Sequence, residues 1–177
     1  CVKPYGSTFL IFSDYMRPPI RLASLMDLPA FHVFTHDSIS VGEDGPTHQP
    51  VEQLAGLRAI PGLVTLRPAD ANEVTEAYRV VMGLKHQTAC LVLSRQGLPT
   101  FDRSRYASAA GLARGAYVMA DPAGGARPDL ILMASGSEVQ HCVKVYEELS
   151  AEGAKVRVVS MPSWDLFERQ DQAYRDS

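Results

Sequence analysis

The sequence lacks the features of membrane-spanning, secreted and nucleic-acid-binding proteins. No apolar run approaches the ~20 residues that a membrane-spanning helix needs. The net charge of -3 over 177 residues gives no reason to expect nucleic acid or an anionic membrane as a partner. The chain does not begin with Met, and its first residues form no signal peptide. Neither end of the sequence carries a feature that typically begins or ends a protein, so we expect that this chain is a piece of a longer one.

Cysteine is scarce and follows no pattern. The three residues, Cys1, Cys90 and Cys142, are odd in number and widely spaced, and they form no CxxC or Cys-His ligand pattern. Cys90 lies in an apolar run and Cys142 in a helical pattern, so we expect both to be buried small hydrophobic side chains rather than reactive thiols. This use of cysteine favours a cytoplasmic protein.

The composition is that of a globular protein, with 46% apolar and 21% charged residues. The apolar periodicity alternates between strands and helices. It predicts strands at 8–12, 31–34, 62–67, 88–94, 129–134 and 156–160, and helices at 20–28, 49–59, 70–82 and 139–149. This alternation predicts an α/β fold with a mostly parallel sheet flanked by helices, followed by part of a second α/β domain.

Two breaks divide the pattern. Residues 99–114 are polar and irregular, and residues 124–128 (GGARP) are predicted to form a turn between strands. We therefore predict a first domain at 1–98, a linker with one strand at 99–128, and an incomplete second domain at 129–177. The second domain would contain one right-handed βαβ unit.

The most informative stretch follows the predicted strand 31–34. It carries His36, Asp44 and His48 on a glycine-containing loop, and loops at the carboxyl ends of strands are where α/β proteins bind ligands. A lone His, or a Gly-Glu-Asp-Gly run, is more often structural than functional. The density of titratable groups between apolar flanks still indicates a ligand site, although the residues alone leave its type open.

Residues 42–53 (GEDGPTHQPVEQ) resemble the motif of the pyrimidine-binding domain of the transketolase family. Four further segments resemble that family in the same order, namely 5–17 (YGSTFLIFSDYMR), 93–96 (LSRQ), 134–139 (ASGSEV) and 158–163 (VVSMPS). The resemblance covers nearly the whole chain. It implies a transfer of a two-carbon ketol unit from a ketose phosphate to an aldose phosphate, with thiamine diphosphate and a divalent cation as cofactors.

The resemblance also implies roles for individual residues. Phe12 should stack on the aminopyrimidine ring of the cofactor, with Phe9 and Tyr15 completing the pocket, although an apolar strand residue such as Phe9 is usually plain core. His48 should transfer protons to and from the donor substrate.

The same resemblance assigns the sugar-phosphate contacts. Asp44 should bind a sugar hydroxyl, while His36 and Arg95 should hold the substrate phosphate; a surface ion pair is the ordinary alternative for an Arg. The remaining histidines match no functional position, and we expect them to be structural or solvated: His32, His86 and His141.

Parts of the family's site are absent from this sequence. In the family the cofactor lies between two chains of a homodimer, and a separate domain holds the diphosphate and the Mg²⁺ or Ca²⁺ ion. The glutamate that activates the cofactor would lie before Cys1. We therefore expect no metal site within this chain and no activity from the chain alone.

Three alternatives remain open. Dihydroxyacetone synthase shares much of the pattern. Deoxyxylulose phosphate synthase is disfavoured, because we would expect Gly rather than Pro after the Thr-His pair and an aromatic-Asp pair downstream, whereas Gln49-Pro50 and Glu52-Gln53 stand there. A non-catalytic homologue would not need Phe12, Asp44, His48 and Arg95 together.

Overall fold

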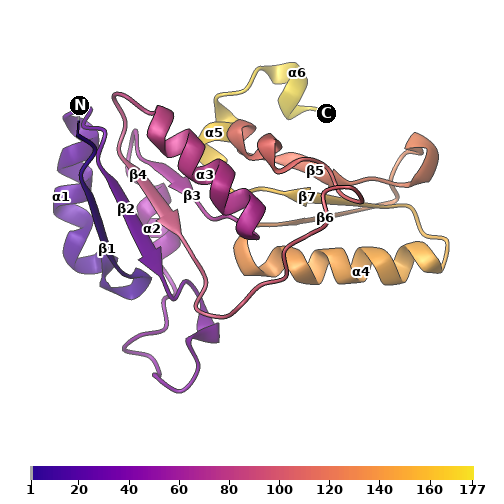
Figure 1. Ribbon diagram of the computed structural model, residues 1–177, viewed down its shortest axis with the longest axis horizontal. Coiled ribbons are helices and arrows are strands. Elements are labelled where there is room, and N and C mark those ends of the chain that lie inside the picture. Colours follow the sequence, from indigo (N-terminus) through magenta and orange to yellow (C-terminus); the bar gives the residue numbers. More distant parts are fainter. Residues whose placement is uncertain (1) are drawn as a thin grey trace. The chain divides into compact units, whose positions relative to one another are not determined.

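The structure, a computed structural model, describes residues 2–177 and divides into two compact units (Figure 1). The first unit extends to Arg67 and takes in Ala77–Gly97. The second contains Pro68–Glu76 and Leu98–Ser177. No helix within residues 2–177 is long and apolar enough to cross a membrane.

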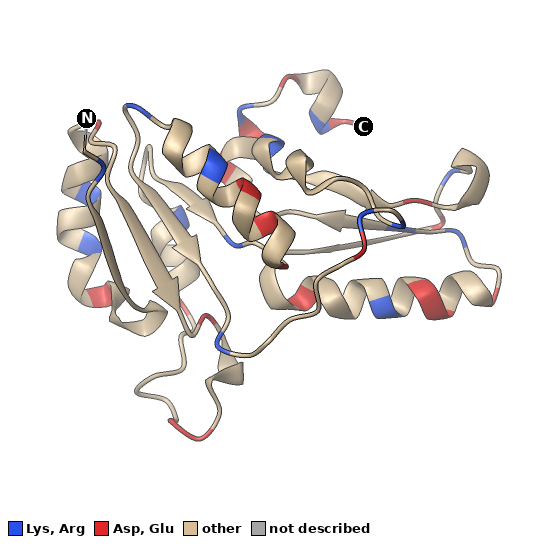
Figure 2. Cartoon of the chain, viewed as in Figure 1, with Lys and Arg blue, Asp and Glu red and all other residues tan. Residues whose placement is uncertain are grey.

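A four-stranded parallel sheet forms the centre of the first unit. Its strands are β1 (Tyr5–Phe9), β2 (Phe31–Thr35), β3 (Val64–Leu66) and β4 (Ala89–Val92), in the order β1-β2-β4-β3. None of these strands carries a charged residue (Figure 2), as expected for parallel strands covered on both faces. The predicted parallel α/β architecture is confirmed.

Helices cover both faces of this sheet. They are α1 (Ser13–Leu25), α2 (Gln53–Arg58) and α3 (Ala71–Gly83), with short 3-10 helices η1 (Leu10–Phe12) and η2 (Ile39–Val41). Ile20 of α1 and Leu57 of α2 form one core cluster with Phe34. Tyr78 of α3 meets Phe31 edge to face. Because side chains alternate along a strand, Phe31 and Phe34 point to opposite faces.

The predicted strand 8–12 is wrong from Leu10 onward, and the predicted helix 20–28 begins too late. The chain leaves β1 at Phe9, turns through η1 and enters α1 at Ser13. Pro18 and Pro19 lie inside α1, although proline lacks the N–H that a helix interior uses. Both prolines are exposed, so water can reach the carbonyl groups that they leave without an N–H partner.

The predicted helix 49–59 is also too long, because α2 begins only at Gln53. The buried Gln53 side chain accepts a hydrogen bond from Val51 N and donates one to Asp14 Oδ2, both at 2.9 Å. Gln49 Nε2 donates to Gly42 O at 2.9 Å. These side-chain bonds hold residues 42–52 as a loop rather than as a first helical turn.

The second unit is built on a three-stranded mixed sheet. Its strands are β5 (Tyr117–Ala120), β6 (Leu130–Ala134) and β7 (Val156–Ser160), in the order β5-β7-β6. Helix α4 (Val139–Ala151) joins the parallel pair β6 and β7, which confirms the predicted βαβ unit, while β5 is antiparallel to β7. The unit also contains η3 (Ala109–Arg114), η4 (Ala123–Gly125), η5 (Gly136–Glu138), α5 (Trp164–Glu168) and α6 (Gln172–Arg175).

A buried carboxylate lies at the centre of a polar network in the second unit. Glu73 is 0% exposed and accepts hydrogen bonds from Ser160 Oγ at 2.6 Å, Tyr117 OH at 2.7 Å and Ala69 N at 2.8 Å. Its neighbour Asp70 caps α3 by accepting from Glu73 N at 2.8 Å. Burial raises the pKa of Glu73, and the three hydrogen bonds oppose part of that rise.

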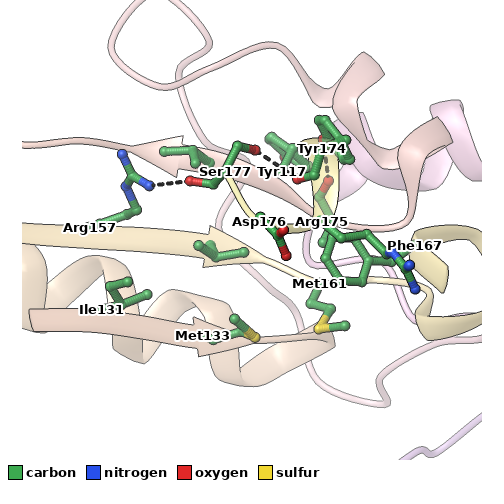
Figure 3. A pocket seen from close by; sticks show the side chains of 13 residues that line it. Tyr117, Ile131, Met133, Arg157, Met161, Phe167, Tyr174, Arg175, Asp176 and Ser177 are labelled. Carbon is green, nitrogen blue, oxygen red and sulfur yellow. Dashed lines mark hydrogen bonds between the residues drawn. The ribbon is translucent and has the colours of Figure 1, made fainter. Parts of the chain in front are cut away.

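One face of the second sheet borders a cavity of about 480 Å³ (Figure 3). Ile131 and Met133 of β6 are 52% and 57% exposed there. Arg157 of β7 donates from Nη1 to the carbonyl oxygen of Ser177 at 3.1 Å. No residue that the sequence predicts for a functional site lines this cavity.

Candidate functional site

The predicted site residues lie at or just beyond the carboxyl ends of the strands in the first sheet. Phe9 ends β1, Phe12 lies in η1, and Tyr15 is in the first turn of α1. The others follow as well: His36 directly after β2, Asp44 and His48 between η2 and α2, and Arg95 three residues after β4. This edge is where open α/β sheets bind their ligands.

Five of these side chains form one ring cluster. The His36 ring stacks on Phe9 with centroids 3.6 Å apart and planes 18° apart. Phe9 stacks with Phe12 at 6.1 Å, and Phe12 lies 6.2 Å from Tyr15. His48 meets Phe12 edge to face at 5.5 Å and Phe9 at 6.2 Å. The fold therefore brings together residues that lie up to 39 positions apart, from Phe9 to His48.

Both histidines of the cluster are fixed through Nδ1. Thr35 Oγ1 lies 2.9 Å from Nδ1 of His36, and Thr47 Oγ1 lies 2.9 Å from Nδ1 of His48. His48 N also donates to Gly45 O at 3.0 Å. Within residues 2–177 no hydrogen bond reaches Nε2 of His48, so this nitrogen is the one available to exchange a proton with a ligand.

Asp44 and Arg95 are both exposed. Gly42 and Gly45 flank Asp44 with φ values of 88° and 75°, which glycine adopts without strain. Within the part of the chain that the structure describes, no hydrogen bond, ion pair or ring contact joins Asp44 or Arg95 to the ring cluster. Contact of these two residues with a sugar phosphate stays a prediction.

The ring cluster fits a flat heteroaromatic group. Phe12 is half-buried and Tyr15 is 82% exposed, so aromatic surface is open next to the imidazole of His48, and offset stacking holds a planar ring well. Among residues 2–177 no group of three or more His, Cys, Asp or Glu side chains is placed to hold a metal ion.

The other histidines lie away from the ring contacts of this cluster. His32 is part of β2, and burial lowers its pKa. His86 and His141 are exposed. Roles as structural or solvated residues are in keeping with these positions.

A buried ion pair at the same edge was not predicted from the sequence. Asp37 directly follows His36, and Arg67 directly follows β3. The Nε and Nη2 atoms of Arg67 both lie 2.7 Å from Oδ2 of Asp37, and the side chains are only 8% and 1% exposed. One feature of the sequence could have indicated this pair, because Asp37 and Arg67 are each the first charged residue after a strand.

Comparison with known proteins agrees with this geometry. The profile "Transketolase, pyrimidine binding domain" matches residues 1–100, and "Transketolase-like TK C-terminal domain" matches residues 115–177. A transketolase from Halalkalibacterium halodurans is 56% identical over 175 residues, which are 99% of this chain and 26% of that protein.

Solved structures give the same result. A transketolase from Leishmania mexicana has 43% identity and a TM-score of 0.90, over 99% of this chain and 25% of that one. A Pichia stipitis transketolase in complex with sedoheptulose 7-phosphate has 40% identity and a TM-score of 0.89, over 98% and 25%. This chain spans about a quarter of the length of these relatives and belongs to the transketolase family.

Proposed function

We propose that this chain works as part of a longer transketolase, which transfers a two-carbon ketol unit from a ketose phosphate to an aldose phosphate. The observation that best supports the proposal is the ring cluster. In it the ring centroids of Phe12 and His48 lie 5.5 Å apart at the carboxyl edge of a parallel sheet. An aromatic platform beside a half-buried imidazole suits a reaction in which a planar cofactor and a proton carrier act on one carbonyl group.

The cofactor in this proposal is thiamine diphosphate. When bound, it supplies a nucleophilic thiazolium carbon and an electron sink for the two-carbon unit. Phe12 holds the aminopyrimidine ring by stacking, and Phe9 and Tyr15 border it. Phe9 itself stacks on His36 and Phe12, so it supports the platform from the sheet side.

The proposed role of His48 is to carry a proton through Nε2. The ring is held at Nδ1 by Thr47 and meets the ring of Phe12 edge to face. A side chain fixed in this way keeps its proton-transfer distance constant through the reaction. An imidazole can both accept and donate a proton at its ring nitrogens, which suits the removal and the return of a proton.

The substrate in this proposal is a sugar phosphate. His36 and Arg95 follow adjacent strands, β2 and β4, and together present an imidazole and a guanidinium for one phosphate group. Asp44 accepts a hydrogen bond from a sugar hydroxyl next to the reacting carbon, and a substrate without that hydroxyl leaves the carboxylate unpaired. The sugar phosphate held by the Pichia stipitis relative supports this substrate class.

Replacement of Arg95 by alanine tests the phosphate contact. A charge-assisted hydrogen bond contributes about 1.5–3 kcal/mol, so KM for a phosphorylated ketose should rise by about 10- to 100-fold in the full-length enzyme. KM for the same ketose without phosphate should stay unchanged. Arg127→Ala, in an exposed loop of the second unit, is the matched control. Equal effects of Arg95→Ala on both ketoses would exclude a phosphate contact.

Three further parts of the proposal concern the whole protein. We propose a homodimer with the cofactor between its chains, which agrees with the open aromatic surface at Tyr15. A divalent cation, Mg²⁺ or Ca²⁺, is held with the diphosphate by a domain outside residues 1–177. A cytoplasmic location suits the free thiols of Cys90 and Cys142.

The choice of acceptor tests the function. With thiamine diphosphate and Mg²⁺ present, the full-length protein should use ribose 5-phosphate as acceptor for the ketol unit of xylulose 5-phosphate, and should use formaldehyde poorly. A preference for formaldehyde would identify a dihydroxyacetone synthase instead. The isolated chain of 177 residues should show no transfer, and activity in a rigorously purified sample of it would refute that part of the proposal.

A further inference from the structure

The buried ion pair between Asp37 and Arg67 joins two loops of the candidate site. Asp37 follows β2 and Arg67 follows β3, while β4 lies between these strands in the sheet order β1-β2-β4-β3. Neighbouring strands are about 4.8 Å apart, so the pair spans roughly 10 Å along the carboxyl edge. The end of β4, from which the chain leads to Arg95, lies within that span.

The ladder of hydrogen bonds continues just beyond the strands at this point. Phe34 of β2 pairs with Val92 of β4, and Leu93 N donates to Phe34 O at 2.7 Å. The segments that lead to His36 and to Arg95 are therefore in register with each other. The ion pair links Asp37, the residue after His36, to Arg67, the residue after β3. It thereby connects the ends of the two strands on either side of β4.

The pair is poorly suited to a purely stabilising role. Both guanidinium contacts go to Oδ2, and Oδ1 of Asp37 is buried without a hydrogen-bond partner among residues 2–177. A buried acceptor left in this state costs stability. Replacement of a buried ion pair by apolar side chains is often neutral or stabilising, whereas the geometry that the pair imposes is lost. The ion pair fixes the relative position of its two side chains, and a pair of apolar side chains would not do so.

The backbone next to the pair needs such a constraint. His36 has a φ of 61°, a left-handed conformation that is unfavourable for a residue with a Cβ. Strained conformations persist where their surroundings fix them from several sides, and they concentrate at functional sites. Here the stack on Phe9 fixes the ring of His36, and the ion pair of Asp37 fixes the following residue.

We infer that Asp37 and Arg67 are positioning residues, which hold His36 and the loop of Arg95 at the spacing that one substrate phosphate requires. This inference rests on the proposed function. The pair does not touch the substrate itself, and it acts through the backbone at His36 and through the end of β4. It therefore governs phosphate recognition and leaves proton transfer by His48 in place.

The test is Asp37→Asn in the full-length enzyme, with initial rates measured for a ketose phosphate and for the same ketose without phosphate. We expect KM for the phosphorylated donor to rise about tenfold, because small misplacements of a binding group have effects of this size or larger. KM for the unphosphorylated donor and kcat should change little. In a His36→Ala background, Asp37→Asn should have no further effect on KM, since residues that act as one unit are not additive.

Asp27→Asn is the matched control, because Asp27 is exposed and lies outside the site; it should behave as wild type. Arg67→Lys is the second variant, which keeps the charge but loses the two-nitrogen contact, and it should show the same split between donors. Equal changes of KM for both donors, or failure of both variants to fold, would overturn the inference. An inactive wild-type enzyme would instead refute the proposed function.

Discussion

Replacement of His48 by alanine in the full-length enzyme is expected to lower kcat by about 10²- to 10⁴-fold, the usual contribution of a positioned proton-transfer group. Its effect on the affinity for thiamine diphosphate should be much smaller. The contact of His48 with Phe12 is edge to face at 5.5 Å, and such pairs contribute about 0.5–1.5 kcal/mol, which is at most about tenfold in affinity. Initial rates and cofactor titration measure the two effects separately.

His86→Ala is the control for this experiment, since His86 is exposed and outside the ring cluster. Its kcat should equal that of wild type. A His48→Ala variant that keeps wild-type turnover would remove His48 from proton transfer. A loss confined to cofactor affinity would make it a binding residue only.

Replacement of Glu73 by alanine is expected to lower the free energy of unfolding of the second unit by about 3 kcal/mol. The change leaves Ser160 Oγ, Tyr117 OH and Ala69 N without their buried acceptor, and each unsatisfied buried group costs about 1–3 kcal/mol, partly offset by removal of a buried carboxylate. Urea unfolding followed by the fluorescence of Trp164, the single tryptophan, reports on this unit because Trp164 lies in α5.

Glu148→Ala provides the matched control for Glu73. Its side chain is 61% exposed and lies 4.0 Å from Lys144, and an exposed pair of this kind contributes about 0–1 kcal/mol. Equal unfolding midpoints for the two variants would show that the network around Glu73 does not stabilise the unit.

The raised pKa of Glu73 also predicts a dependence on pH. Burial raises this pKa above the ordinary value of 4.5, so the folded state binds the proton more tightly than the unfolded state. Stability therefore falls as pH rises from 4.5 through the raised pKa, and is constant above it. Glu73→Gln lacks this titration. The advantage of wild type over Glu73→Gln in unfolding free energy should shrink as pH rises across that window, whereas an advantage that grows would contradict the pKa direction.

Much of the fold follows from local sequence signals. The strand Val156–Ser160 and the start of α4 at Val139 agree with prediction, because their apolar periodicity matches their burial. The start of α1 could not be predicted in the same way. Pro18 and Pro19 argue against a helix at their positions, and only their exposed setting in the folded unit makes them tolerable.

In the candidate site, too, some features could be predicted from the sequence and others could not. The motif around His48 and the aromatic segment from Phe9 to Tyr15 mark the site in the sequence. The stack of His36 on Phe9 and the pairing of Asp37 with Arg67 depend on strands that are distant in sequence but share one sheet edge. Such contacts require the strand order, in which β4 lies between β2 and β3, and no local pattern encodes that order.

We propose that this chain is part of a working thiamine diphosphate-dependent transketolase. The most direct test is the initial rate of the full-length enzyme with xylulose 5-phosphate and ribose 5-phosphate, measured with and without thiamine diphosphate and Mg²⁺. We expect transfer that requires the cofactor. Absence of transfer with both cofactors present and the dimer intact would contradict the claim and favour a non-catalytic homologue.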